Sequence, residues 1–181
     1  MATTGTSNNS GKSKSTTRSA AAKKAAETRA RDAVAMLKAD HRKVEDLFKQ
    51  FEKTEQAAKR KDIVGQIIME LRVHMTIEEE IFYPESREFV AEELTVNEAI
   101  VEHEGAKNLM MELEGMDPSD EMYEAKVTVL QEMIEHHVEE EEKEYFPEAQ
   151  KNGMPTKEIG ERMMARKEEL MGEMDGPERT H

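Results

Sequence analysis

Apolar residues recur at alternating steps of three and four in four stretches of the chain, which is the spacing of one face of an α-helix. The four stripes run from Val34 to Phe51, from Val64 to Ile81, from Val96 to Leu113 and from Tyr123 to Glu141. Short polar or proline-containing segments separate them. Four amphipathic helices with short connections predict an all-α protein, an antiparallel up-down four-helix bundle.

Helix breakers mark the ends of the predicted helices. They are the polar stretch 54–60, Pro84, the sequence GMDPSD at 115–120, and Pro147 followed by NGMP. We expect each proline to end a helix, because proline disfavours the helical conformation of the residue before it. The pattern predicts a bundle over residues 32–150 and, within a C-terminal region of residues 151–181, a peripheral helix at about 157–174.

The helical pattern repeats once along the chain. The segment DHRKVEDLF aligns with EHEGAKNLM at an offset of 62 residues, and HMTIEEEIFYP aligns with HVEEEEKEYFP at an offset of 63. A single residue in a loop accounts for the difference between the two offsets. The bundle is therefore predicted to consist of one helical hairpin used twice, with a pseudo-twofold axis through its core.

Each of the four stripes carries one histidine among apolar neighbours, and two stripes add a glutamate one turn later on the same face. These positions are His41, His74, Glu78, His103, His137 and Glu141. Ionised carboxylates in a bundle core are costly unless they are paired or bound to a cation, and two that face each other also repel. The pattern predicts a pair of metal ions that the two glutamates bridge and the histidines cap, two to each ion.

The donor types indicate which metal is bound. Imidazole and carboxylate without thiolate suit non-haem iron or manganese better than structural zinc, and the chain contains no cysteine. The Glu-x-x-His pairs of ferritin-type bundles are absent from the four stripes, and the His-Glu-x-x-His motif of metalloproteases is absent from the sequence. The site is thus predicted to be a di-metal centre of a different type.

Other side chains on and beside the stripes are assigned to packing. We expect three methionines to fill the core, four aromatic residues to close one end of the bundle, and His136 to lie outside the stripe. The packing residues are Met110, Met111, Met133, Phe82, Tyr83, Tyr145 and Phe146.

The sequence resembles the hemerythrin-like proteins, in the branch called HHE cation-binding domains, over about residues 33–148. The four segments aligned above carry the resemblance, because each contains a histidine and two contain His-x-x-x-Glu before an aromatic-proline end. The resemblance implies a four-helix bundle with an oxo- or hydroxo-bridged di-iron (Fe) centre. It also implies that the four histidines are terminal ligands and that Glu78 and Glu141 are bridging ligands.

The sequence departs from the oxygen carriers of that family at Lys107, where the carriers have a second histidine four residues after the third-helix ligand. Glu45, Glu79, Glu140 or water could fill the remaining coordination position. The departure argues against reversible oxygen carriage and leaves metal binding intact.

The charge is unevenly distributed. Residues 1–31 contain seven basic residues and one acidic residue, a net charge of +6. Because the net charge of the whole chain is −14, the remaining residues carry −20. The first 31 residues are rich in Ser, Thr, Asn and Gly and are predicted to form a disordered basic tail. The acidic body repels nucleic acids and anionic membranes, which leaves the tail as the place for a weak nucleic-acid contact.

The leading functional hypothesis is a di-iron protein that senses, stores or detoxifies a small ligand such as dioxygen, nitric oxide or peroxide. One alternative is a peroxide-consuming or ferrous-oxidising enzyme, although no general acid or base is visible beyond the ligands. Another is an iron-buffering or stress-associated interaction protein. The sequence lacks a membrane-length apolar run, a secretory signal and cysteine, and a cytoplasmic location is expected. The oligomeric state is left open.

Overall fold

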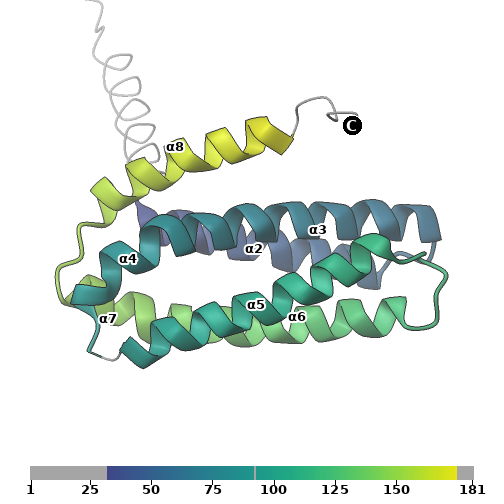
Figure 1. Ribbon diagram of the computed structural model, residues 1–181, viewed down its shortest axis with the longest axis horizontal. Coiled ribbons are helices and arrows are strands. Elements are labelled where there is room, and N and C mark those ends of the chain that lie inside the picture. The colour runs from purple at the N-terminus through teal and green to yellow at the C-terminus, as the bar shows by residue number, and fades with distance from the viewer. Residues whose placement is uncertain (1–31, 92, 175–181) are drawn as a thin grey trace, which may run out of the picture.

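Residues 32–91 and 93–174 are described by a computed structural model of the chain. All regular elements in these residues are helical (Figure 1). The predicted disordered tail of residues 1–31 lies outside the described residues. No described helix combines the length and the apolar character that a crossing of the bilayer requires.

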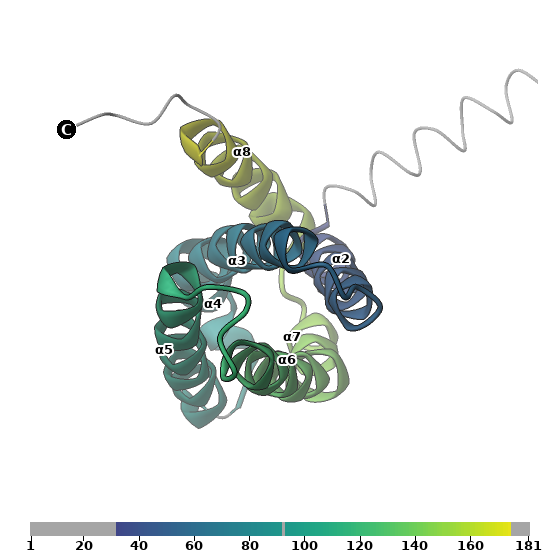
Figure 2. The ribbon, with the colours of Figure 1, turned by 90° about the vertical axis from the view of Figure 1, so that its right-hand side faces the viewer.

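Four long helices form the bundle. They are α2 (Ala33–Glu52), α3 (Ala57–Ile77), α5 (Glu93–Gly115) and α6 (Tyr123–Glu140). Seen along the bundle, they make a closed ring (Figure 2), in which the two hairpins α2–α3 and α5–α6 pack side by side. The predicted four-helix bundle is confirmed. Asp32 fixes the start of α2, since its side chain accepts a hydrogen bond from the Ala35 amide at 3.0 Å.

Neither Pro84 nor Pro147 ends its helix, so the prediction that these two prolines stop helices was wrong. Two π-helical turns, η1 (Glu78–Phe82) and η3 (Glu141–Tyr145), follow α3 and α6, and each is continued by a short α-helix that has a proline in its first turn. These helices are α4 (Tyr83–Ser86) and α7 (Phe146–Lys151), and a 3₁₀ turn, η2 (Arg87–Phe89), follows α4. A proline in the first turn of a helical segment loses no hydrogen bond that the segment needs. The chain therefore changes its helical pitch at Glu78 and again at Glu141.

Two apolar clusters fill the bundle, one on each side of the histidine level. On α2, Leu37 belongs to one cluster and Val44 to the other, and His41 lies between them. The predicted aromatic group at one end is confirmed: Phe82, Tyr83, Tyr145 and Phe146 pack with ring centroids 5.4–6.4 Å apart. The polar layer is thus closed off by apolar side chains above and below.

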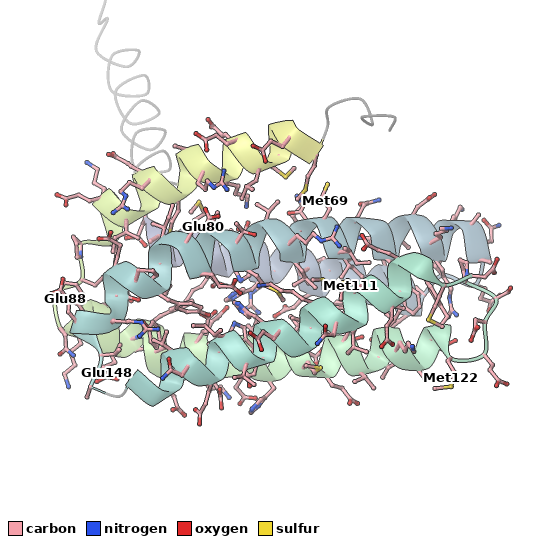
Figure 3. All side chains as sticks on the ribbon, viewed as in Figure 1. Met69, Glu80, Glu88, Met111, Met122 and Glu148 are labelled. Carbon is pink, nitrogen blue, oxygen red and sulfur yellow. The ribbon has the colours of Figure 1, made fainter. Side chains whose placement is uncertain are left out.

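The methionine prediction was wrong at one position. Met110 is 1% exposed and packs in the core, whereas Met111 is 60% exposed on the outer side of α5 (Figure 3). Successive residues of a helix point about 100° apart, so both neighbours cannot lie on the same stripe. Met133 is half-buried beside Gly105, where an added Cβ would lie 2.7 Å from the methionine methyl carbon.

A further helix, α8 (Thr156–Met174), lies outside the ring of four, against α2, α3 and η1 (Figures 1 and 2). It corresponds to the peripheral helix predicted at 157–174. Ile159, Met163 and Leu170 are buried in the same apolar cluster as the aromatic group. The helix is therefore packed onto the bundle through apolar side chains.

The two adjacent methionines provide a stability test. Met110→Ala is expected to lower the free energy of unfolding by about 2–5 kcal/mol, because it leaves a cavity in the core. Met111→Ala, the matched control, should change it by no more than about 0.5 kcal/mol. Urea unfolding in the presence of a chelator measures both values, and similar losses for the two variants would contradict this orientation of α5.

Candidate metal centre

The structure brings all four predicted histidines to one level of the bundle interior, one from each long helix. His41, His74, His103 and His137 are between 1% and 5% exposed. They form two pairs across the hairpins: the Nε2 atoms of His41 and His74 are 3.2 Å apart, and those of His103 and His137 are 3.1 Å apart. The four imidazoles therefore present their Nε2 atoms to a common interior space.

Glu78 and Glu141 lie between the two histidine pairs, and each contacts one member of both. The Oε2 atom of Glu78 is 3.2 Å from Nε2 of His74 and 3.6 Å from Nε2 of His103. The Oε2 atom of Glu141 is 3.3 Å from Nε2 of His41 and 3.6 Å from Nε2 of His137. Each carboxylate thus reaches both pairs, which is the placement that a bridging ligand needs.

These two carboxylates are buried without adequate partners. Glu78 is 0% exposed and Glu141 is 3% exposed. Within the described residues neither oxygen of Glu78 makes a hydrogen bond, and neither does Oε2 of Glu141. A buried ion without a partner costs several kcal/mol. The unpaired oxygens converge on the histidine Nε2 atoms, so the protein interior contains a preformed place for positive charge.

One hydroxyl group breaks the twofold symmetry of this arrangement. The Tyr83 hydroxyl donates to Oε1 of Glu141 at 3.0 Å. The residue equivalent to Tyr83 in the second half of the chain is Phe146, which stacks on the His41 ring at a centroid distance of 6.0 Å and has no hydroxyl to offer Glu78. Glu78 is therefore the less stabilised of the two carboxylates.

The electrostatics of the pair agree with this asymmetry. Burial, together with the charge of Glu141, raises the pKa of Glu78 well above its ordinary value. Burial opposes the ionisation of Glu141 as well, but His137 and His41 outweigh it and lower the pKa of that carboxyl to about 2. Burial also lowers the pKa of His74 to about 4, which keeps this imidazole neutral and able to bind a metal. The protein's own groups thus stabilise one of the two carboxylates in the charged form, and a bound cation would stabilise both.

The donor spacing fits two ions. Two nitrogen atoms bound to one ion at about 2.1 Å lie roughly 3.0–3.4 Å apart for bond angles of roughly 90–110°, and the two Nε2 separations fall in that range. Two groups of donor atoms lie close enough together to hold an ion. One group is His41, His74, Glu78 and Glu141, and the other is Glu78, His103 and His137.

A second layer of carboxylates, which the sequence analysis did not predict, contacts the outer nitrogen of each imidazole. Three Nδ1 atoms lie within hydrogen-bonding distance of a glutamate: His41 of Glu142 at 2.9 Å, His103 of Glu79 at 2.8 Å, and His137 of Glu102 at 2.9 Å. The fourth, in His74, lies 3.8 Å from Oδ2 of Asp40. A carboxylate at Nδ1 fixes the tautomer and directs the Nε2 lone pair into the centre.

This layer follows the same repeat as the histidines, so the signal was present in the sequence. Asp40 and Glu102 each directly precede a histidine, and Glu79 and Glu142 each directly follow an inward-facing glutamate. These are equivalent positions in the two halves of the chain. Their role became visible only when the helices were placed, because each carboxylate contacts a histidine on another helix.

None of the three glutamates considered for the remaining coordination position points into the centre. Glu79 binds the Lys107 ammonium at 2.6 and 2.7 Å. Glu45 accepts a hydrogen bond from Arg42 at 2.6 Å, and Glu140 lies 3.4 Å from His136. Lys107, at the position of the carriers' extra histidine, therefore neutralises a carboxylate at the edge of the bundle and contributes no ligand.

A third group of possible ligands, Glu102, His136 and Glu140, lies at the surface. The side chain of His136 is 64% exposed, which agrees with its predicted place outside the stripe. Water can solvate these groups, and one oxygen of Glu102 is already bound to His137. Unlike the interior site, this cluster does not contain a buried charge that requires a cation.

The electrostatics of Glu78 can be tested in metal-free protein. Above the ordinary pKa of glutamate the unfolded chain releases the Glu78 proton and the folded chain retains it, so wild-type stability falls as the pH rises, by at most about 1.4 kcal/mol per pH unit. Glu78→Gln removes this loss and should raise the urea midpoint at pH 7 in the presence of a chelator. Glu139→Gln, at an exposed position, is the control and should leave the midpoint unchanged. A lower midpoint for Glu78→Gln than for wild type would show that the protein alone compensates the Glu78 charge.

Comparison with known proteins identifies the same family that the sequence resembles. The family model described as Hemerythrin HHE cation binding domain matches residues 32–149. A curated DNA nickase from Nostoc sp. is 30% identical over 117 residues, which are 65% of this chain and 33% of the nickase, so the chain spans about a third of that relative. The crystal structure of a hemerythrin HHE cation binding domain-containing protein from Mycobacterium kansasii is similar, with a TM-score of 0.68, 25% sequence identity, and coverage of 78% of this chain and 88% of that chain. The chain belongs to the hemerythrin HHE cation-binding domain family.

Proposed function

We propose that this protein is a non-haem di-iron protein whose buried centre binds a small ligand such as dioxygen, nitric oxide or peroxide. The observation that carries the proposal is the pair of buried glutamates, Glu78 and Glu141. Three of their four oxygens make no hydrogen bond in the described structure, and the pair lies among four converging imidazoles. In this proposal His41 and His74 would hold one iron, His103 and His137 would hold the other, and Glu78 and Glu141 would be shared between them. Bound iron would supply a redox-active Lewis acid at the centre of the bundle.

The donor set supports iron. Four imidazoles and two carboxylates, with no thiolate, suit non-haem iron and exclude a Cys-based zinc site. The Nδ1–carboxylate contacts raise the basicity of the imidazoles and hold them in place. Manganese shares these preferences, and metal analysis of the purified protein distinguishes it from iron.

The space beside the centre limits the size of a ligand. A cavity of about 10 Å³ lies next to the four histidines, and its apolar lining comes from Val44, Leu71, Met75, Ile134 and Val138. A second cavity of about 10 Å³ is lined by Tyr83, Ala99 and Glu141, among others. Each has room for about one water molecule. Of the candidate ligands, diatomic molecules and peroxide come closest to this size, and organic substrates are far larger.

The second candidate function is an enzyme that consumes peroxide or oxidises ferrous iron at the same centre. One observation favours it: the Tyr83 hydroxyl lies at the edge of the centre, 3.0 Å from Oε1 of Glu141. Burial and the charge of Glu141 raise the pKa of Tyr83, so the hydroxyl retains its proton and can donate a hydrogen bond to a ligand bound at the centre. If turnover uses this hydrogen bond, Tyr83→Phe should slow iron-dependent peroxide consumption by about 10²-fold. Tyr123→Phe, at a tyrosine buried in the other apolar cluster, should leave it unchanged.

The nickase activity of the Nostoc relative is not part of the proposal. The matched region is one third of that protein, and the body of this chain carries a net charge of −20, which repels DNA. A cytoplasmic location remains part of the proposal, since a chain without cysteine fits a reducing compartment.

Metal analysis of the purified protein tests the proposal. We expect about two irons per chain and a ligand-to-iron charge-transfer absorption that changes when azide is added. Glu141→Gln should lose most of this iron, because one bridging carboxylate is gone. Glu139→Gln is the matched control in the same run of glutamates, since its side chain is 58% exposed and pairs with Lys143, and it should retain both irons. Wild-type protein without iron after aerobic loading, or equal iron content in the two variants, would contradict the proposal.

A further inference from the structure

Each of the four carboxylates that contact the histidine Nδ1 atoms is itself backed by a basic side chain. Glu142 pairs with Arg42, Glu79 pairs with Lys107, and Glu102 lies 3.7 Å from His136. These three basic residues belong to the bundle helices. The fourth, Lys167, belongs to α8, and its ammonium group donates a hydrogen bond to Oδ1 of Asp40.

Asp40 depends on its basic partner more than the other three carboxylates do. The side chains of Glu142, Glu79 and Glu102 are 21–28% exposed, so water can solvate them. The side chain of Asp40 is 10% exposed, and Oδ2, which faces His74, makes no hydrogen bond in the described structure. Without Lys167, Asp40 would be a nearly buried carboxylate beside a neutral imidazole, and its charged form would be poorly stabilised.

Several contacts independent of Lys167 hold α8 in place. Ile159, Met163 and Leu170 are buried against the bundle. Arg166 donates to both oxygens of Glu80, which lies on η1 on the side facing α8 (Figure 3), and Arg162 donates to Glu85. Loss of the Lys167 charge alone should therefore leave α8 docked, so the effect of the charge can be separated from the effect of the helix.

We propose that Lys167 is a positioning residue of the metal centre, and that α8 thereby couples its own docking to metal affinity at the His41–His74 position. The inference rests on the proposed metal-binding function. The Lys167 ammonium group binds Oδ1 of Asp40 and so keeps Oδ2 facing Nδ1 of His74 at 3.8 Å, which directs the Nε2 lone pair of His74 toward the centre. Coupling is reciprocal, so metal at this position also stabilises the docked α8. The His103–His137 position depends on bundle residues only.

Iron release to an excess of chelator, followed by absorption, provides the test in the full-length iron-loaded protein. In Lys167→Met, one of the two irons is expected to leave about 10–100-fold faster than in wild type, and the other at the wild-type rate. Lys167→Arg, which keeps the charge, should restore slow release. Arg162→Met is the matched control, because it removes an ion pair between α8 and the bundle that does not involve Asp40, and it should release both irons as wild type does.

Hydrogen exchange of the α8 amides gives a readout that is independent of iron release. In wild type, iron loading should slow this exchange. Without metal, Lys167→Met should exchange at the wild-type rate, and iron should not slow its exchange. His74→Ala should likewise abolish the slowing, and adding Lys167→Met to it should cause no further change.

The outcomes separate this inference from the proposed function. If wild type binds no iron, the proposed function fails. If wild type binds two irons and Lys167→Met releases both as slowly as wild type, the positioning role is overturned and the function stands. If Lys167→Met undocks α8, iron release from the Asp40→Asn variant decides between the two outcomes. Fast release of one iron from this variant supports the inference, and release of both irons at the wild-type rate overturns it.

Discussion

Two carboxylates that face each other inside an apolar bundle are the constraint on which the structure depends. Glu78 and Glu141 are fully buried, and most of their oxygens lack hydrogen-bond partners in the described structure. Four imidazoles surround them, the Nδ1 carboxylates fix the orientation of those imidazoles, and apolar clusters close the layer on both sides. The burial of two carboxylates at this level is costly for a protein without bound metal and becomes favourable if two cations neutralise the glutamates.

The position of this layer could be predicted from the sequence because helical periodicity assigns each residue to a face. His41, His74, His103 and His137 all fell on apolar stripes, and the structure places all four at one level. The prediction that Met111 fills the core was wrong because it departed from this periodicity, which places the neighbour Met110 on the stripe. The duplication of the hairpin predicted two equivalent halves, and the π turns at Glu78 and Glu141 follow that duplication. The π turns themselves were not predicted, because they change the helical pitch without disturbing the apolar pattern before them.

The remaining features of the site could not be predicted from the sequence, because they depend on contacts between helices. The stripe of a helix indicates which residues face inward but not which residue of a neighbouring helix they meet, so the pairing of Glu142 with His41 became visible only in three dimensions. Lys167 is separated from Asp40 by 127 residues, and no local pattern connects them. The inner histidines and glutamates and the Nδ1 carboxylates occupy equivalent positions in the two halves of the chain, whereas the hydroxyl group of Tyr83 and the outer basic residues do not. The two halves of the candidate metal centre are therefore not equivalent.

Diffraction from crystals of the protein grown with iron, with anomalous scattering measured at the iron absorption edge, would locate the bound metal. We expect two anomalous peaks within the bundle, one beside Nε2 of His41 and His74 and the other beside Nε2 of His103 and His137. Glu78 and Glu141 should each contact both peaks. A single peak, peaks elsewhere in the molecule, or glutamate side chains that turn away from the histidines would contradict the proposed di-metal centre.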